Sequence, residues 1–207
     1  MLTVKGIIIR VTDYKEKDRL LTLAAFNKGL LTVNAKGARG EKARLKCYSN
    51  LLTFGEFQLT EAKNRYILCG VDCEENFFNL WTDPARYSAG ILCLELFEKV
   101  ARENDDINEE LLRLLKALRD INYSPSYPLV FAARFMTQIM TANGVDYKEI
   151  ASYDEDVYRL VERIAKETEI PDSEEIYVKK GIQFLGILLK NALNIHLRVI
   201  SEILKTL

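Results

Sequence analysis

The residues with the most evident chemistry are lysines and arginines near the start of the chain. Five of them fall within eleven residues, offset only by Glu41: Lys36, Arg39, Lys42, Arg44 and Lys46. Cations at this spacing can follow successive phosphates of a flexible polyanion, and affinity would then come largely from counterion release. Gly37 and Gly40 would let the backbone approach such a polymer closely. The alternative is a solvated surface loop whose charge has no ligand.

The same end of the chain carries a surplus of positive charge. The first fifty residues hold eleven basic and four acidic side chains, a balance of +7, and the remainder holds eighteen basic and twenty-six acidic ones, a balance of −8. Arg10, Lys17 and Arg19 lie where strands should end, so a barrel could bring them to one face. Three aromatic residues are candidate platforms for stacked bases, although partly buried packing is the simpler interpretation of each: Tyr14, Tyr48 and Phe54. We therefore expect any nucleic-acid contact to come from the N-terminal end.

Little in the sequence points to catalysis. It contains no G-x-x-x-x-G-K-[ST] loop and no G-x-G-x-x-G turn that would hold nucleotide phosphates. The only histidine, His196, lies in an apolar stretch, where we expect it to be a structural residue deep in a helical segment. A single histidine gives no strong signal of a Ser-His nucleophilic site. We expect no catalytic residues and no cofactor.

The four cysteines offer one close pair, Cys69 and Cys73. On a strand these two side chains would point to the same side and could meet a metal together. No second pair follows at zinc-ribbon spacing, so we expect reduced, buried free cysteines and no metal site.

The bulk composition is that of an ordinary globular protein. The 207 residues are 48% hydrophobic and 29% charged, which suffices for one large domain or two small ones. No apolar run approaches the roughly 20 residues that cross a bilayer. The first residues also lack the charged, apolar and small regions of a signal peptide. We expect a cytoplasmic, nucleoid-associated protein with no membrane contact.

Residue patterns predict strands first and helices afterwards. Five short β-branched or alternating segments fall within the first 75 residues: 3–12, 19–26, 30–35, 51–60 and 66–71. They favour a small closed barrel, with the OB-fold as the first candidate and an SH3-like barrel as the alternative. Helical spacing predicts helices from Pro84 onward, including 129–143, 154–168 and one or two helices over 178–205. The fold class is thus α+β, with a barrel domain over 1–78 and an α-helical domain over 79–207.

Several of these segments resemble the RecO family of bacterial DNA repair proteins. The likeness rests mainly on Gly6–Arg10, Asp13–Leu23, Lys28-Gly29 and Ala35–Arg39, with looser agreement at Gly55–Phe57 and Leu94–Leu96. The resemblance implies an OB-fold followed by a helical domain, and a recombination mediator in place of an enzyme. The family's conserved basic positions correspond to Arg10, Arg19, Lys36 and Arg39, while Lys42, Arg44 and Lys46 are added here on charge alone.

The resemblance also implies a function and partners. Members bind single- and double-stranded DNA, anneal complementary strands, and act with RecR and the single-stranded DNA-binding protein SSB to place RecA on DNA. Many relatives carry a four-cysteine zinc module in the second half, whereas no cysteine follows Cys93 here, so zinc is not expected. The family's pocket for the SSB C-terminal tail lies in that half, where no residues could be matched. The alternative function is an adaptor whose barrel and helical groove bind repair proteins with little DNA affinity.

Overall fold

The computed structural model describes residues 1–40, 45–63, 65–101, 106–166 and 174–205. The chain forms two compact units. One comprises Met1–Phe77 with Ala101–Leu111, and the other comprises Phe78–Val100 with Leu112–Leu207. The division into domains at 1–78 and 79–207 stays a prediction about independently folding parts. Lys42 and Arg44 lie outside the described residues.

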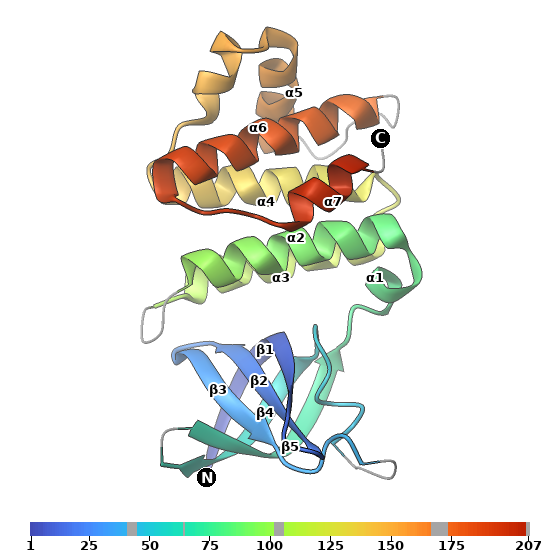
Figure 1. Cartoon of the computed structure of the whole chain (residues 1–207), viewed down its shortest axis with the longest axis vertical. Helices are drawn as coiled ribbons and strands as arrows, with labels where there is room; N and C mark the ends of the chain where they lie inside the picture. Colours follow the sequence, from blue (N-terminus) through green and yellow to red (C-terminus); the bar gives the residue numbers. More distant parts are fainter. Residues whose placement is uncertain (41–44, 64, 102–105, 167–173, 206–207) are drawn as a thin grey trace. The chain divides into compact units, whose positions relative to one another are not determined.

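The first unit contains a closed barrel of five strands (Figure 1). The strands are β1 Leu2–Tyr14, β2 Asp18–Ala25, β3 Gly29–Ala35, β4 Phe54–Ala62 and β5 Arg65–Glu75. Their order around the barrel is β1-β2-β3-β5-β4, and β4 closes the ring on β1. β3 and β5 run parallel, while the other four pairings are antiparallel. This topology confirms the predicted OB-fold and the α+β class.

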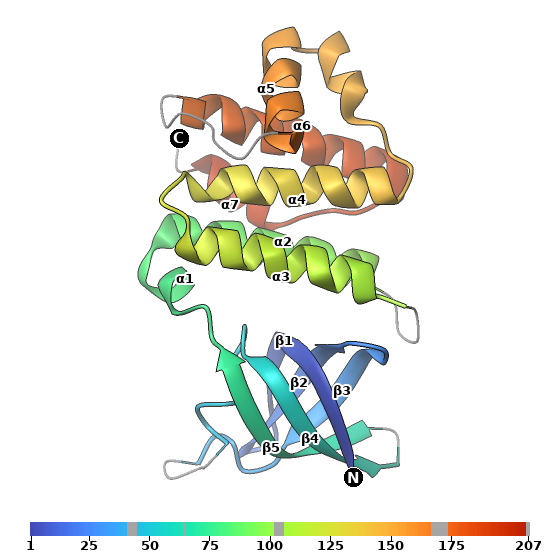
Figure 2. The same ribbon diagram turned by 180° about the vertical axis from the view of Figure 1, so that it is seen from behind.

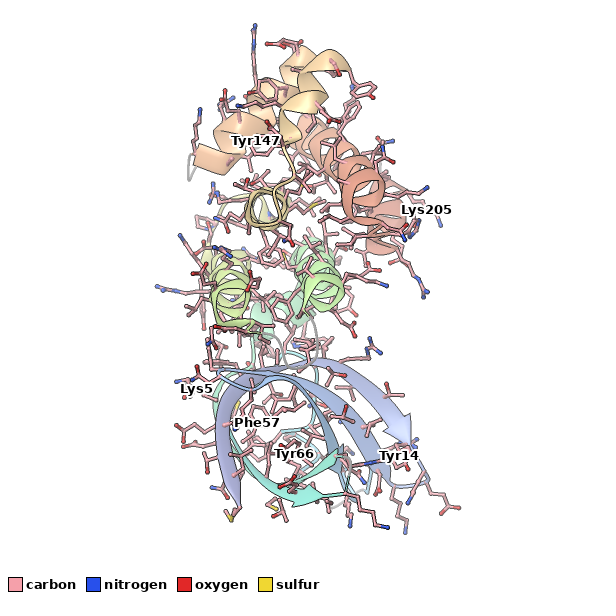
Figure 3. All side chains as sticks on the ribbon, turned by 90° about the vertical axis from the view of Figure 1, so that its left-hand side faces the viewer. Lys5, Tyr14, Phe57, Tyr66, Tyr147 and Lys205 are labelled. Carbon is pink, nitrogen blue, oxygen red and sulfur yellow. The ribbon has the colours of Figure 1, made fainter. Side chains whose placement is uncertain are left out.

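Alternating side chains fill the barrel. Phe57 and Leu59 of β4 point inward with Leu21 and Leu23 of β2, and all four are at most 1% exposed. Figure 3 shows Phe57 within the barrel and Tyr14 at its edge. These strands correspond to the five β-branched or alternating segments that the sequence predicted.

Two glycines allow close approach of neighbouring strands: Gly6 lets β1 approach β2, and Gly55 lets β4 approach β5. Gly6 of β1 lies opposite Gly55 of β4 in the antiparallel register. A Cβ atom on Gly6 would collide with the carbonyl oxygen of Ala24, and one on Gly55 would collide with that of Asp72. The closed barrel therefore needs residues without side chains at both positions.

The remaining elements are helical. They are α1 Phe78–Thr82, α2 Pro84–Val100, α3 Asn108–Tyr123, α4 Pro128–Ala142, the short 3₁₀ helix η1 Tyr147–Ser152, α5 Glu155–Lys166, α6 Glu175–Leu193 and α7 Val199–Lys205. In the second unit α4 is central and packs against α2, α5 and α6 (Figure 2). Among the described residues, none of the helices has both the length and the apolarity that a bilayer crossing would require.

Local sequence explains where several of these helices begin and end. Pro128 opens α4, and Gly144 follows its end with φ of +73°. The C-terminal apolar stretch, predicted as one or two helices, is two, because Asn194 adopts a left-handed conformation with φ of +55°. The helices α1 and η1 were not predicted. α1 has five residues and is held by hydrogen bonds between Asn79 and Asn122, a contact that sequence periodicity does not reveal.

Candidate nucleic-acid interface

The barrel surface contains a depression of about 520 Å³. Its walls come from the ends of β1, β3 and β4, the start of β5, and the turns that follow β1, β3 and β4. Eight residues line it: Tyr14, Lys15, Asn34, Lys36, Ala62, Lys63, Arg65 and Ile67. Four of these are cationic and none is a carboxylate, so the described lining, here called the cationic depression, favours an anion.

Aromatic contact holds part of this charge in place. The guanidinium of Arg65 lies 5.3 Å from the centre of the Tyr14 ring, and the ammonium of Lys15 lies 5.4 Å from it. Each such cation–π contact is worth roughly 0.5–1 kcal/mol at an exposed site. Tyr14, a candidate stacking platform whose simpler interpretation was partly buried packing, thus contacts two cations with its ring.

Two of the four cationic residues have a backbone conformation with positive φ. Lys15 has φ of +53° and Lys63 has φ of +48°, in the left-handed region that residues with a Cβ atom seldom adopt. Such a conformation costs about 1–2 kcal/mol per residue. Lys15 lies in the turn between β1 and β2, and Lys63 lies in the turn between β4 and β5. Both turns therefore place a positive charge at the depression.

The structure places the predicted residues in different settings. Lys36 lines the depression, while Arg10 is exposed on β1, where it lies opposite Thr22 of β2. Lys46 is exposed in the turns that precede β4. Lys42 and Arg44 remain predictions outside the described residues.

The side chains of Arg19 and Arg39 form hydrogen bonds within the chain. One guanidinium nitrogen of Arg19 donates to the carbonyl oxygen and hydroxyl of Ser49, each at 3.2 Å, and to Oδ1 of Asn50 at 2.8 Å. These bonds tie the start of β2 to the segment before β4, and Arg19 itself is half-buried. Arg39 contacts the turn between β1 and β2 in a similar way.

Sequence reasoning missed three of the four cations of the depression as site residues: Lys15, Lys63 and Arg65. Lys63 and Arg65 are 27 or more residues from Lys36 in the chain, and only barrel closure brings β5 beside β3. A usable signal existed, because OB-folds bind ligands with the β1–β2 and β4–β5 loops, and these residues occupy or flank those loops.

The structure also corrects expectations about histidine and cysteine. His196 is exposed in the segment between α6 and α7 and is not deep in a helix, because α6 stops at Asn194. Cys47 and Cys69 are exposed and Cys73 is half-buried, whereas Cys93 is fully buried as expected. Exposure of Cys69 follows from its outward position on β5. Across the described ranges, no three histidine, cysteine or acidic side chains gather as a metal would require.

A second concavity of about 220 Å³, here called the α6–α7 groove, lies in the helical unit. Its lining combines apolar side chains, among them Ile187, Leu197 and Ile200, with Lys190 and His196. A Cβ atom on Gly186 would collide with the side chain of Ile200, so this glycine lets α7 approach α6.

A carboxylate from α2 holds the start of α7, one of the two helices that line this groove. The two oxygens of Glu95 accept hydrogen bonds from the backbone N–H groups of Arg198 and Val199, at 2.9 and 3.1 Å. A carboxylate at the start of α7 satisfies donors that the helix leaves unpaired. The groove therefore combines an apolar floor with the side chains of Lys190 and His196, and its helix α7 is held at its start by Glu95.

Comparison with known proteins agrees with this architecture. The family profile described as Recombination protein O N terminal matches residues 1–76. Proteins named DNA repair protein RecO are similar over longer stretches. The one from Acetivibrio thermocellus is 28% identical over 69% of this chain, and that from Thermobifida fusca is 29% identical over 68%. The one from Desulfitobacterium hafniense is 35% identical over 45%.

The fold defines a protein with an OB barrel followed by helices. The sequence likeness narrows this class: the chain is similar to proteins named DNA repair protein RecO, and the matching N-terminal family profile covers its barrel. The match covers 57% of the length of the Acetivibrio protein, 58% of the Thermobifida protein and 34% of the Desulfitobacterium protein. The chain thus spans about three fifths or less of those proteins.

Proposed function

We propose that this protein acts in DNA repair and recombination as a mediator that binds single- and double-stranded DNA and anneals complementary strands. The observation that carries the proposal is the cationic depression, where four cations converge and no lining residue is acidic. Similarity to the RecO family supports it, because the relatives are named DNA repair proteins. Helping to load RecA onto SSB-coated DNA, together with RecR, is the wider role that we propose.

Charge reversal of the depression tests DNA binding. The triple variant Lys36→Glu, Lys63→Glu and Arg65→Glu should weaken binding of a single-stranded oligonucleotide at least tenfold, because three attractions to phosphate become repulsions. The slope of log affinity against log salt should fall by about 0.7 for each phosphate that the variant no longer neutralises. Lys28→Glu is the control, since Lys28 is exposed in the β2–β3 turn at the opposite end of β2. Equal affinities for the triple variant and the control would refute the depression as the DNA site.

We propose that the other predicted cations extend this surface. Arg10 and Lys46 are exposed and add positive charge to the same unit, and Lys42 and Arg44 add more in sequence. Arg19 and Arg39 would contribute through the segments to which they donate hydrogen bonds. Single alanine variants of Arg10 and Lys46 should each weaken DNA binding by a smaller factor than the triple variant does.

We propose annealing without chemistry on the substrate. Complementary oligonucleotides should anneal faster with the protein than without it, in the absence of ATP and of divalent metal. Hydrolysis of DNA or ATP by the purified protein would contradict the proposal that it is not an enzyme.

The α6–α7 groove favours a second activity, the binding of a partner's peptide. Its apolar floor would accept an apolar side chain, and Lys190 beside His196 would attract a terminal carboxylate. The SSB C-terminal tail is the peptide that we propose for it. In the adaptor alternative this groove would be the main site, and DNA affinity would be feeble.

Matched variants on one helix test the groove. Ile187→Glu places a carboxylate in the groove, while Ile176→Glu changes an equally exposed isoleucine at the other end of α6. The first should weaken binding of a synthetic SSB-tail peptide about tenfold or more, by burying an unpaired charge, and the second should not. Amidation of the peptide's carboxylate should also weaken it. Measuring peptide and DNA affinities at the same physiological salt separates the mediator from the adaptor.

A further inference from the structure

Arg39 directs its side chain at the protein's own backbone. One guanidinium nitrogen donates to the carbonyl oxygens of Lys15 and Glu16, at 3.3 and 3.2 Å. The other lies 3.2 Å from a carboxylate oxygen of Asp13. The backbone N–H of Arg39 adds a bond of 2.9 Å to the carbonyl of Lys17. Both terminal nitrogens of the guanidinium are thus engaged, one with the turn that joins β1 to β2 and the other with the end of β1.

Asp18 holds the same turn from its other side. One carboxylate oxygen accepts the backbone N–H of Gly37 at 2.8 Å, and the other accepts the side-chain amide of Asn34 at 3.4 Å. Gly37 has φ of +67°, so the chain leaves β3 through a left-handed turn that the carboxylate fixes. Bonds from Arg39 and Asp18 therefore join the β1–β2 turn to the segment that follows β3.

The joined segments carry two cations of the depression. Lys15 belongs to the β1–β2 turn, and Lys36 precedes Gly37 directly. Without these bonds each segment would sample many conformations, and holding both lysines at one ligand would cost conformational entropy. A phosphate that claimed Arg39 would have to displace two carbonyl oxygens and a carboxylate.

We infer that Arg39 and Asp18 are positioning residues, which set Lys15 and Lys36 around the cationic depression without binding the nucleic acid themselves. The inference rests on the proposed function of that depression. It assigns Arg39 a role different from a direct phosphate contact. It also gives an acidic residue beside an anion site a role that favours binding.

Replacing Asp18 distinguishes positioning from simple charge repulsion, because the two predict opposite changes in DNA affinity. Asp18→Ala deletes a negative charge close to Lys36, so pure electrostatics predicts tighter binding of a single-stranded oligonucleotide. Loss of positioning predicts binding about tenfold weaker, the scale of one missing charge-assisted hydrogen bond. Asp18→Asn keeps an oxygen for the Gly37 N–H and should bind at least as tightly as the native protein. Glu56→Ala is the control, because it deletes an exposed carboxylate on β4. Tighter binding by Asp18→Ala would overturn the inference.

Arg39→Lys provides the second test. A lysine keeps the positive charge but cannot hold two carbonyls and a carboxylate with one planar fork. Positioning predicts that Arg39→Lys weakens DNA binding nearly as much as Arg39→Ala. Native affinity and an unchanged salt slope in Arg39→Lys would mean that charge alone matters, and would overturn the inference.

A measurement without DNA keeps this inference distinct from the proposed function. Backbone amide exchange at Gly37 and Arg39 should accelerate about tenfold in Asp18→Ala and in Arg39→Lys, respectively, as the bonded segments open. Exchange that stays at the native rate in both would overturn the positioning role. Accelerated exchange combined with undiminished DNA binding by the triple charge-reversal variant would instead refute the DNA site, with the positions of the two segments still explained.

Discussion

The cationic depression and the α6–α7 groove show two different ways of building a binding surface. The depression gathers charged residues from turns at the ends of strands, two of them on left-handed backbone, and its shape depends on hydrogen bonds to main-chain groups. The groove lies between helices that pack against each other, where Gly186 lets α7 approach α6 and the carboxylate of Glu95 holds the start of α7. The first therefore suits a charged polymer, and the second suits an apolar segment.

The largest effect should come from breaking the barrel that supports the depression. In Gly55→Ala the new methyl group would collide with the backbone carbonyl of Asp72, and a backbone cannot rotate away as a side chain does. We expect a loss of about 3 kcal/mol or more in stability of the barrel. DNA affinity should fall with it, while the helical circular dichroism signal and SSB-tail binding persist.

Gly70→Ala is the matched control on the neighbouring strand. Its methyl group would meet only the end of the Gln58 side chain, which can move aside. We expect a change within about 0.5 kcal/mol, as for other surface substitutions. Thermal melts of the two variants give the comparison. Loss of peptide binding in Gly55→Ala would show that the two surfaces depend on each other.

Raising the salt concentration should weaken DNA binding by the depression much more than peptide binding by the groove. This is the next largest effect that we expect. Four phosphate contacts on a single strand give a salt exponent of about −2.8, so DNA affinity should fall about fiftyfold between roughly 50 and 200 mM salt. The peptide affinity of the groove should change only a few-fold, because its floor is apolar. Titrations of both ligands across that range measure the difference. Equal salt slopes would remove the distinction between the surfaces.

The smallest expected effect is a pH dependence of the stability of the helical unit, through Glu175 at the start of α6. At the start of α6 the carboxylate of Glu175 accepts a hydrogen bond from Tyr127 and lies 3.2 Å from Nζ of Lys179, which is buried. These contacts lower the pKa of Glu175 below its ordinary value of 4.5, the Tyr127 bond contributing most, while burial and this carboxylate raise the pKa of Tyr127. Since the folded state favours the ionised carboxylate, its contribution is complete above pH 4.5 and is lost as the pH falls through the lower folded pKa.

Tyr127→Phe should therefore destabilise the helical unit by about 1 kcal/mol or less near neutral pH. The penalty should shrink in acid, where the native protein loses the same contribution. Chemical denaturation followed at several pH values measures this, with Tyr153→Phe as the control because Tyr153 is 73% exposed. DNA binding by the barrel should be unaffected near neutral pH. A penalty that grows in acid would contradict the assignment.

Much of this architecture could be predicted from residue patterns in the sequence. β-Branched or alternating segments predicted all five strands, and Ile8, Leu21 and Phe57 of three of them lie in the barrel core. The helix predicted over 129–143 corresponds to α4, Pro128–Ala142, and Gly144 follows its end. The short helix α1 was missed because its hydrogen bonds to Asn122 come from 43 residues away. Likewise, apolar neighbours made His196 look buried, because the break at Asn194 could not be distinguished from a continuous helix.

The sequence by itself determined that positive charge gathers at one end of the chain and that this end forms a barrel. Both follow from composition and short-range periodicity, which require no knowledge of distant contacts. Only the tertiary structure decided which cations meet: closure of β5 against β3 brings Lys63 and Arg65 beside Lys36. It also directed Arg39 toward the backbone of a turn more than twenty residues earlier. Charge can be counted along a chain, but convergence depends on register and closure, which are set by the packing of the whole barrel.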